Sequence, residues 1–393
     1  MRDFLKRTWA EVDLDAITAN LKAIRAYIRP GCRLLATVKA DAYGHGAPEV
    51  AREMEREGAD YFGVSNLEEA LQLRHSGIRR PVLILGYTPA ASAGELIGQR
   101  ITQTVFSEEY ARSLSEAAVR AGGRVRVHLK IDTGMSRIGF VMHGSADEKA
   151  CAGAMVRAAA LPGLEVEGVF THFAVSDEPE NPFTRVQFDR FMRAVSLCGQ
   201  QGVHFAIRHC CNSAGLLNFP NMQLDMVRPG IILYGLTPAE GMPLSIRLTP
   251  AMSLKTVLFQ QKTLGPDTPV SYGMIYRTPA ERVLGTLPIG YADGFTRNLS
   301  GRAEVLVRGR RARIVGRVCM DQCMADITGI PDVPGECEVT IIGRDGKDCI
   351  TTEEFAGWAG TINYEVVCLI GKRVPRVFYR GGQKVGLLDY ILP

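Results

Sequence analysis

The sequence predicts an α/β protein in which a (β/α)8 TIM-type barrel is followed by a mostly β C-terminal domain. Eight short apolar, β-rich segments alternate with helix-like stretches up to residue 244, a pattern typical of βαβ units with parallel strands. From residue 245 onward this pattern gives way to alternating segments separated by Gly, Pro and Asp turns. With 393 residues the chain is long enough for two domains. We therefore expect a barrel at residues 12–244 and a β-rich domain at residues 245–393.

The first predicted element is a helix with Asp13 or Asp15 as its cap. Its apolar residues recur at helical spacing and are Ile17, Leu21, Ile24 and Ile28. The eight predicted barrel strands are residues 34–38, 61–64, 82–85, 102–106, 125–131, 166–170, 205–208 and 231–234. Helix-like stretches separate most of them, for example residues 47–57, 67–73 and 108–121.

Eight such units fit a closed barrel better than an open sheet. A doubly wound fold is the alternative, but no GxGxxG turn follows the first predicted strand. In a barrel the chemistry lies at the carboxyl ends of the strands. Chemically active residues occur there: Lys39 follows the first strand, Arg137 the fifth, His172 the sixth and Asn212-Ser213 the seventh, while residues 228–231 lead into the eighth.

The predicted C-terminal domain consists mainly of strands. Its alternating segments are residues 283–287, 304–307, 312–318 and 339–342. One helix is predicted near residues 352–359.

Composition excludes several classes of function. The net charge of +4 comes from scattered Lys and Arg residues, which argues against nucleic-acid binding. No apolar run reaches the roughly 18 residues of a membrane span, and the N-terminus carries no stretch typical of a signal peptide. The ten cysteines are dispersed and form neither a CxxC pair nor a zinc-like cluster, so we expect reduced thiols, no metal site and a cytoplasmic protein.

The segment Thr37-Val-Lys-Ala-Asp-Ala-Tyr-Gly-His-Gly46 carries the strongest chemical signal. Lys39 closes an apolar strand and is followed by a Gly-containing turn, so its amine lies where solvation is poor. The pKa of such an amine shifts readily, which favours attack on aldehydes and action as a base. A solvated lysine at the start of a loop is the structural alternative for the segment alone.

Further motifs follow in order along the chain. They are His128-Leu-Lys-Ile-Asp-Thr-Gly-Met-Ser-Arg137, Thr171-His172, Asn212-Ser-Ala-Gly215, Arg228-Pro-Gly230, Ser271-Tyr-Gly273, Gly290-Tyr-Ala-Asp-Gly294, Cys319-Met-Asp321 and Asn363-Tyr-Glu365. With the lysine segment, they resemble the pyridoxal-phosphate-dependent alanine racemases from about residue 7 to residue 380. The resemblance implies an isomerase that interconverts L- and D-alanine for peptidoglycan, and it implies that residues 1–11 join the β-rich domain.

The resemblance also implies which residues bind the cofactor. They are Lys39, Tyr43, His172, Asn212, Ser213, Arg228, Gly230, Ile231 and Tyr364. Lys39 would bind the cofactor's aldehyde, and His172 would stack on its ring. The phosphate would rest on the backbone of Gly230 and Ile231 and on the hydroxyls of Ser213, Tyr43 and Tyr364. Glycine at position 230 suits this role because a Cβ would keep the backbone from the anion.

Arg228 would donate to the pyridine nitrogen, by the same resemblance. A guanidinium is effectively never deprotonated, so it cannot give the ring a proton. The ring then stays a weaker electron sink, which suits proton exchange at Cα and suppresses transamination and decarboxylation. Taken alone, an Arg before Pro-Gly is more often a surface ion pair.

Two bases are implied for racemisation, Lys39 on one face of the substrate and Tyr272 on the other. Tyrosine has an unperturbed pKa of about 10, so a tyrosine base needs help from its neighbours. In the family the residues equivalent to Tyr272 and Met320 reach the site of the partner subunit, which implies a homodimer with shared active sites. Arg137 would bind the substrate carboxylate, together with Met320. Lys130 is carbamylated, meets an anion such as chloride, or pairs with a carboxylate.

The chain departs from the family pattern at two places. Cys210-Cys211 precede Asn212 where small residues are expected, and Ser136 replaces a frequent glycine. Neither change removes a functional group. The alternatives are a serine or broader-specificity racemase, a decarboxylase on the same barrel and a non-catalytic pyridoxal-phosphate-binding protein. Arg228 argues against the decarboxylase, and the second domain argues against the non-catalytic protein.

Overall fold

The computed structural model describes residues 4–392, which form two compact units. The barrel unit consists of Thr18–Ala42 and Val50–Leu248. The β-rich unit contains the N-terminal residues up to Ile17, the short segment Tyr43–Glu49 and the chain from Thr249 onward. None of the helices in the described part of the chain is both long and apolar enough to cross a membrane.

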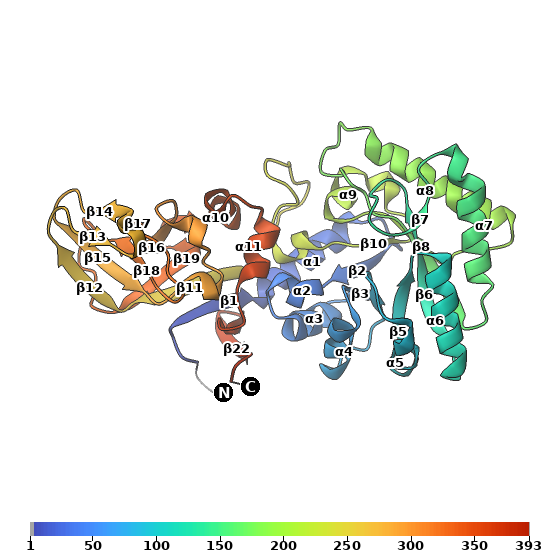
Figure 1. Ribbon diagram of the computed structural model, residues 1–393, viewed down its shortest axis with the longest axis horizontal. Coiled ribbons are helices and arrows are strands. Elements are labelled where there is room, and N and C mark those ends of the chain that lie inside the picture. Colours follow the sequence, from blue (N-terminus) through green and yellow to red (C-terminus); the bar gives the residue numbers. More distant parts are fainter. Residues whose placement is uncertain (1–3, 393) are drawn as a thin grey trace. The chain divides into compact units, whose positions relative to one another are not determined.

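Eight parallel strands form the wall of the barrel unit (Figure 1). In sheet order they are β10 (Met226–Val227), β2 (Arg33–Thr37), β3 (Tyr61–Val64), β4 (Val82–Ile84), β5 (Ile101–Val105), β6 (Val125–Asp132), β8 (Leu164–Phe170) and β9 (Ile207–His209). The backbone amide of Asp225 donates to Arg208 O (3.1 Å) and that of Arg228 to Cys211 O (3.0 Å), so β9 and β10 nearly close the sheet. The predicted fold class is confirmed.

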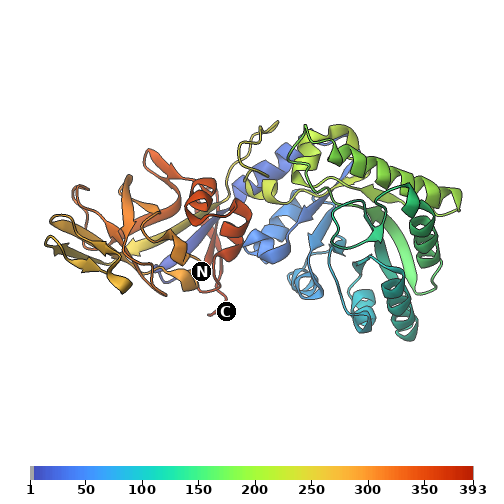
Figure 2. The ribbon, with the colours of Figure 1, turned by 45° about the horizontal axis from the view of Figure 1, so that its top comes forward.

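Helices cover the outside of these strands, as Figure 2 shows in blue through green. They are α1 (Leu14–Tyr27), α3 (Ala47–Arg56), α4 (Leu67–His75), α5 (Ala93–Gly98), α6 (Glu108–Arg120), α7 (Glu148–Ala159), α8 (Phe183–Gln200) and α9 (Ser213–Asn218). Side-chain caps begin several of them, because the first backbone amides of a helix have no partner within it. Asp13 accepts from Asp15 N (2.8 Å) and Ala16 N (3.2 Å), so Asp13 rather than Asp15 caps α1.

The eighth predicted strand, residues 231–234, is wrong. Ile231–Tyr234 is a buried 3-10 helix, and the eighth strand is the shorter β10 just before it. A short, fully apolar segment does not show by its periodicity whether it is a strand or a buried helical turn. The correction moves Arg228 and Gly230 from the amino end of a strand to the carboxyl end of β10.

The β-rich unit is built on a mostly antiparallel sheet. In order, its strands are β12 (Gln260–Leu264), β15 (Arg282–Leu287), β18 (Cys323–Asp326), β17 (Arg310–Val315), β16 (Glu304–Val307), β19 (Cys337–Asp345), β11 (Met252–Leu258), β1 (Thr8–Asp13), β21 (Arg376–Arg380) and β22 (Gln383–Leu388). The N-terminal strand β1 pairs antiparallel with β11 and parallel with β21. The predicted helix is α10 (Thr352–Ala359), but a second helix, α11 (Asn363–Leu369), follows it. Sequence analysis missed α11 because it is short and begins without a side-chain cap.

Candidate active site

His172 marks the centre of a group of basic side chains in the barrel unit. It comes directly after Thr171, at the carboxyl end of β8. The charges that act on its ring belong to Arg228, Lys130, Arg137 and Lys39, which all lie at or beyond the carboxyl halves of strands. Burial first, and then these charges, lower the pKa of His172 well below its usual value. His172 is therefore neutral at neutral pH.

Arg228 is buried among uncharged acceptors. Its Nη1 donates to His209 Nδ1 (2.9 Å), and its Nη2 donates to the carbonyls of Thr171 (2.8 Å) and Cys210 (3.1 Å). The same Nη2 lies 3.3 Å from His172 Nδ1. Burial lowers the pKa of Arg228 to about 10, so the guanidinium stays a cation at neutral pH.

These contacts fix the proton on His172. A guanidinium can only donate, so His172 Nδ1 is the acceptor and the single proton of the neutral ring lies on Nε2.

Lys39 begins a left-handed turn. It follows β2, and the next four residues, Ala40 to Tyr43, all have φ between 51° and 56°. For residues with a side chain this conformation costs about 1–2 kcal/mol each, and it persists only where surrounding contacts enforce it. Glu69 supplies one such contact by accepting from Ala40 N (2.7 Å), and its other carboxylate oxygen accepts from Ser65 N (2.7 Å). The predicted Gly-containing turn is therefore a run of strained residues that ends at glycine.

Lys130 is an amine inside the barrel. It is 3% exposed, and its Nζ donates to Ile131 O (2.9 Å) and lies 5.5 Å from the centre of the Phe170 ring. No carboxylate forms an ion pair with it among residues 4–392. Burial, followed by the charge of Arg228, lowers the pKa of Lys130 to about 7. A large fraction of this amine is therefore uncharged at neutral pH.

The loop that carries Arg137 is held by Asp132. One carboxylate oxygen of Asp132 accepts from Gly134 N (3.0 Å) and Ser136 N (2.9 Å), and the other lies 3.3 Å from His143 Nε2. Burial raises the pKa of Asp132, but these hydrogen bonds lower it more, so the group is ionised. Ser136 has φ 55°, a conformation that glycine adopts without strain, which gives a physical reason for the glycine expected here from the resemblance.

Gln187, which the sequence analysis missed, ties two site loops together. It is fully buried on α8, and its Oε1 accepts from Ala174 N (2.8 Å). Its Nε2 donates to Thr133 Oγ1 and to His172 O, both at 3.2 Å. One amide thus connects the loop before Arg137 with the loop of His172. A single polar residue in a helical stretch gives no signal for this role.

The candidate phosphate-binding residues lie where two short helices begin. Asn212 caps α9 by accepting from Gly215 N (2.8 Å), which places Ser213 in its first turn. The 3-10 helix Ile231–Tyr234 begins after Gly230, whose N–H donates to Ser213 Oγ (2.8 Å). Backbone amides and one hydroxyl therefore gather at one place, where an anion is favoured.

The remaining candidates belong to the β-rich unit. Tyr272 is 72% exposed and Met320 is 52% exposed. Both residues lie in turns that are held by hydrogen bonds within this unit. Beside Tyr272, Ser271 Oγ donates to Arg317 O (2.7 Å). Met320 O accepts from Ala292 N (3.1 Å). In the same unit the rings of Tyr43 and Tyr364 lie 6.1 Å apart.

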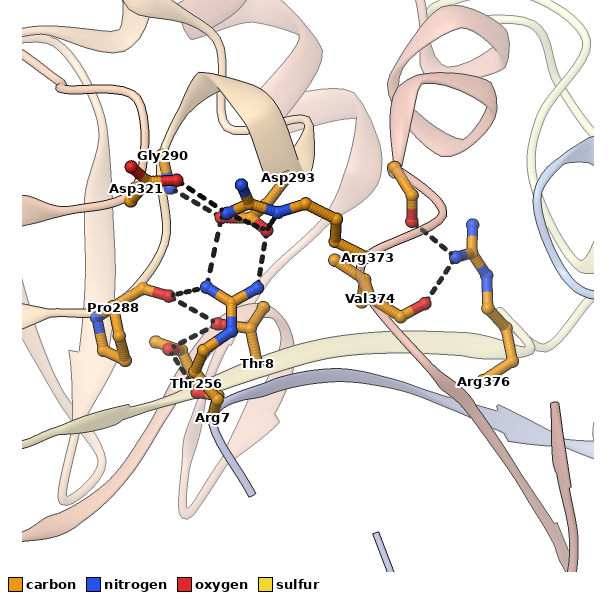
Figure 3. Close-up of polar contacts among 11 residues, drawn as sticks. Arg7, Thr8, Thr256, Pro288, Gly290, Asp293, Asp321, Arg373, Val374 and Arg376 are labelled. Atoms are coloured by element: carbon orange, nitrogen blue, oxygen red, sulfur yellow. Dashed lines mark hydrogen bonds and ion pairs between the residues drawn. The ribbon is translucent and has the colours of Figure 1, made fainter. Parts of the chain in front are cut away.

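A buried carboxylate anchors the turns beside Met320 (Figure 3). Asp293 is fully buried and accepts from Arg7 Nη2 (2.6 Å), Arg373 Nε (3.2 Å) and Gly290 N (3.1 Å). Arg373 also pairs with Asp321 (2.8 Å), the residue after Met320. Two guanidinium groups offset the cost of burying this carboxylate, and the network fixes the exposed turns.

Comparison with known proteins identifies the family. The model of the alanine racemase N-terminal domain matches residues 12–238, and that of the C-terminal domain matches residues 251–378. The chain belongs to the alanine racemase family. The alanine racemase of Desulfovibrio desulfuricans is 48% identical over 378 residues, which cover 96% of this chain and 100% of that protein.

Solved structures agree. The alanine racemase of Clostridium difficile 630 has 39% identity and a TM-score of 0.94, covering 99% of this chain and 100% of that one. A histidine racemase from Leuconostoc mesenteroides subsp. sake has 30% identity and a TM-score of 0.86, covering 96% and 100%. The alanine racemase fold is therefore shown for nearly the whole chain, and a racemase of another amino acid shares it.

Proposed function

We propose that this chain is a pyridoxal-phosphate-dependent alanine racemase that interconverts L- and D-alanine. The observation that carries the proposal is Arg228, a buried cation surrounded by neutral acceptors at the carboxyl end of the last barrel strand. Family membership supports the substrate, because the relatives named above as alanine racemases span the whole chain.

The residues of the barrel unit suit pyridoxal phosphate chemically. Lys39 offers an amine for the aldehyde, and Arg228 offers a donor for a ring nitrogen that can only accept. The N–H of Gly230 donates to Ser213 Oγ and so joins the first residues of two short helices. These residues would offer a hydroxyl and backbone amides for the phosphate. Asn212 would hold Ser213 in place as the cap of α9. Ile231 would add its backbone amide, and the hydroxyls of Tyr43 and Tyr364 would complete the phosphate site.

The first contribution of the protein to the reaction is that Arg228 does not transfer a proton to the cofactor ring. When bound, the cofactor withdraws electrons from the bond between Cα and its hydrogen. Arg228 keeps its proton at neutral pH, so it would donate a hydrogen bond to the ring nitrogen and leave that nitrogen unprotonated. Neutral His172 adds no charge where it would stack. An unprotonated ring nitrogen and a neutral His172 would limit electron withdrawal by the cofactor ring. Proton exchange would then be favoured over decarboxylation or transamination.

Two proton carriers would act on opposite faces of the substrate. Lys39 Nζ would hold or release the proton on one face, and the Tyr272 hydroxyl would do so on the other. Arg137 would bind the substrate carboxylate as a fork, with Met320 beside the substrate. The Asp132 and Gln187 contacts support this role because they fix the loop before Arg137.

We infer a homodimer in which Tyr272 and Met320 serve the site of the partner subunit. Large apolar and aromatic side chains are exposed on the β-rich unit, and exposed apolar groups of this kind typically mark an interface. They are Tyr272, Met274, Ile275, Tyr291 and Met320. Tyr272 is 72% exposed in a single chain, which suits a side chain that a partner subunit would cover.

Lys130 is proposed to be carbamylated. Carbamylation requires an uncharged amine, and a pKa of about 7 provides one at neutral pH. The product is an anion that would pair with Arg137, whose charge already acts on Lys130. A bound anion such as chloride would meet the same need.

The decisive experiment is an assay of D-alanine production from L-alanine with D-amino-acid oxidase, repeated with L-serine. We expect a higher kcat/KM for alanine. The reverse preference would make the chain a serine racemase, since the fold also serves a histidine racemase. No turnover of either amino acid by cofactor-loaded protein would contradict the proposal. In the cell the activity would supply D-alanine for peptidoglycan in the cytoplasm, in keeping with the dispersed cysteines of the sequence.

A further inference from the structure

A chain of four hydrogen bonds runs through the barrel unit from Arg228 to Tyr61. Arg228 Nη1 lies 2.9 Å from His209 Nδ1, and His209 Nε2 lies 2.8 Å from His128 Nδ1. His128 Nε2 is 3.3 Å from Glu167 Oε2, and Tyr61 Oη donates to Glu167 Oε1 (2.9 Å). Both histidines are fully buried.

The chemistry of the donors makes all the hydrogen bonds from Arg228 to Glu167 point the same way, from donor to acceptor. Arg228 can only donate, so His209 accepts at Nδ1 and carries its proton on Nε2. That proton is donated to His128 Nδ1, which leaves the His128 proton on Nε2, facing the carboxylate. Burial lowers the pKa of both histidines, so each ring has one proton to place.

The neighbouring side chains make room for this arrangement. A Cβ at Gly168 would lie 2.7 Å from His128 Cε1, so only glycine leaves space for that ring. The Phe170 ring stacks on His209 with centres 4.8 Å apart and planes 9° apart. The guanidinium of Arg228 also lies over the Phe170 ring, 5.3 Å from its centre. Gly168 and Phe170 of β8 thus position the histidines, and the same strand contributes Glu167.

The series of hydrogen bonds connects a buried cation, Arg228, with a remote anion, Glu167. Direct partners of Arg228 are neutral, whereas Glu167 is half-buried and ionised, because hydrogen bonds from His128 and Tyr61 lower its pKa more than burial raises it. Hydrogen bonds in series polarise one another, and outer partners orient inner ones. We propose that Glu167 is a positioning residue that acts through His128 and His209 to fix the orientation of Arg228 and the proton on each ring.

Glu167→Gln tests the proposal because it keeps the shape of the side chain and removes its charge. Glu165→Gln is the matched control: Glu165 lies on the same strand, is exposed and pairs with Arg126 at 3.8 Å. Nitrogen-15 NMR of the cofactor-free protein reports the protonated nitrogen of each imidazole. A scalar coupling across the N–H···N bond identifies the His209–His128 pair among seven histidines.

In wild-type protein and in Glu165→Gln we expect both rings protonated on Nε2. In Glu167→Gln we expect the Nε2–H signal of His128 to shift, because an amide oxygen accepts this hydrogen bond more weakly than a carboxylate, while Arg228 still fixes the proton of His209. The second readout rests on the proposed racemase function: kcat falls about tenfold in Glu167→Gln, with a smaller change in KM. Glu165→Gln keeps wild-type kinetics.

Unchanged His128 nitrogen signals in Glu167→Gln overturn the proposal, as do changed signals with wild-type kcat. The NMR result is independent of activity. A wild-type protein without racemase activity would therefore contradict the proposed function but not the positioning role of Glu167 that the NMR experiment tests. If Glu167→Gln does not fold, Tyr61→Phe carries the test, because it removes one donor and keeps the charge. It should shift the His128 nitrogen signals in the same direction by less, and unchanged His128 signals would again overturn the proposal.

Discussion

Lys130 is a buried amine whose surroundings oppose its charge. In unfolded chains a lysine has a pKa of about 10.5, and in the fold the value is about 7. Between these values the unfolded state binds more protons, so the free energy of unfolding rises with pH from 7 to 10.5. The charged form of Lys130 therefore destabilises the fold at neutral pH.

We expect Lys130→Met to raise the free energy of unfolding at pH 7 by up to about 5 kcal/mol, since one pKa unit corresponds to about 1.4 kcal/mol. The gain should shrink as the pH rises towards 10. Urea unfolding in carbon-dioxide-free buffer at several pH values measures it. Lys149→Met, at an exposed position of α7, should change little. A gain that is the same at pH 7 and pH 9.5 would contradict the low pKa.

Lys39 is the proposed attachment point of the cofactor. After incubation with pyridoxal phosphate, borohydride reduction and removal of free cofactor, the intact mass of wild-type protein should increase by one cofactor per chain. Lys39→Ala should show no increase, because its side chain has no amine. Lys149→Ala is the control and should behave like wild type. A full mass increase in Lys39→Ala would place the attachment at another lysine.

Among the elements, the left-handed turn after Lys39 is the most strained. Four residues with side chains adopt positive φ there, and Ala40 is the exposed one at its start. The turn also sets the direction in which the chain leaves β2, and therefore where Lys39 points. No propensity rule predicts such a run, because alanine strongly prefers the right-handed helix.

Ala40→Gly should stabilise the protein slightly. It removes about 1–2 kcal/mol of left-handed strain and adds about 0.5–1 kcal/mol of backbone entropy cost. The same change in the right-handed helix α7, Ala154→Gly, should destabilise by about 1 kcal/mol. Equilibrium unfolding in urea compares the two. Equal losses of stability in both variants would show that the turn at position 40 is not strained.

At the scale of the whole molecule, the proposed dimer predicts complementation between two inactive chains. Tyr272→Phe and Lys39→Ala each remove one proton carrier. If Tyr272 serves the partner's site, a mixed dimer contains one site with both carriers intact and one with neither.

Random exchange of subunits in an equal mixture should therefore restore about a quarter of wild-type activity, because half of the dimers are mixed and each has one working site. Subunit exchange is verified with a tag on one variant, and each variant alone is the control. Activity no higher than that of the two variants alone, with exchange verified, would rule out a shared site.

Sequence alone determined the fold class and the family of this protein. The strand-and-helix rhythm predicted the barrel, and the motifs around Lys39 and Arg228 predicted the family, both of which were confirmed. These features are local or periodic, so they can be read along a chain. The same reading mistook Ile231–Tyr234 for a strand, since burial on all sides hides its period.

Only the tertiary structure decided which residues hold the candidate site residues in position. Glu167 stands out in sequence only as a charge within an apolar strand, and Gln187 does not stand out at all. Their partners come from other strands and loops: Glu167 meets His128 of β6, and Gln187 meets Thr133 and His172. Hydrogen bonds between distant segments depend on register and rotamer, which the closed barrel fixes and the order of residues does not state.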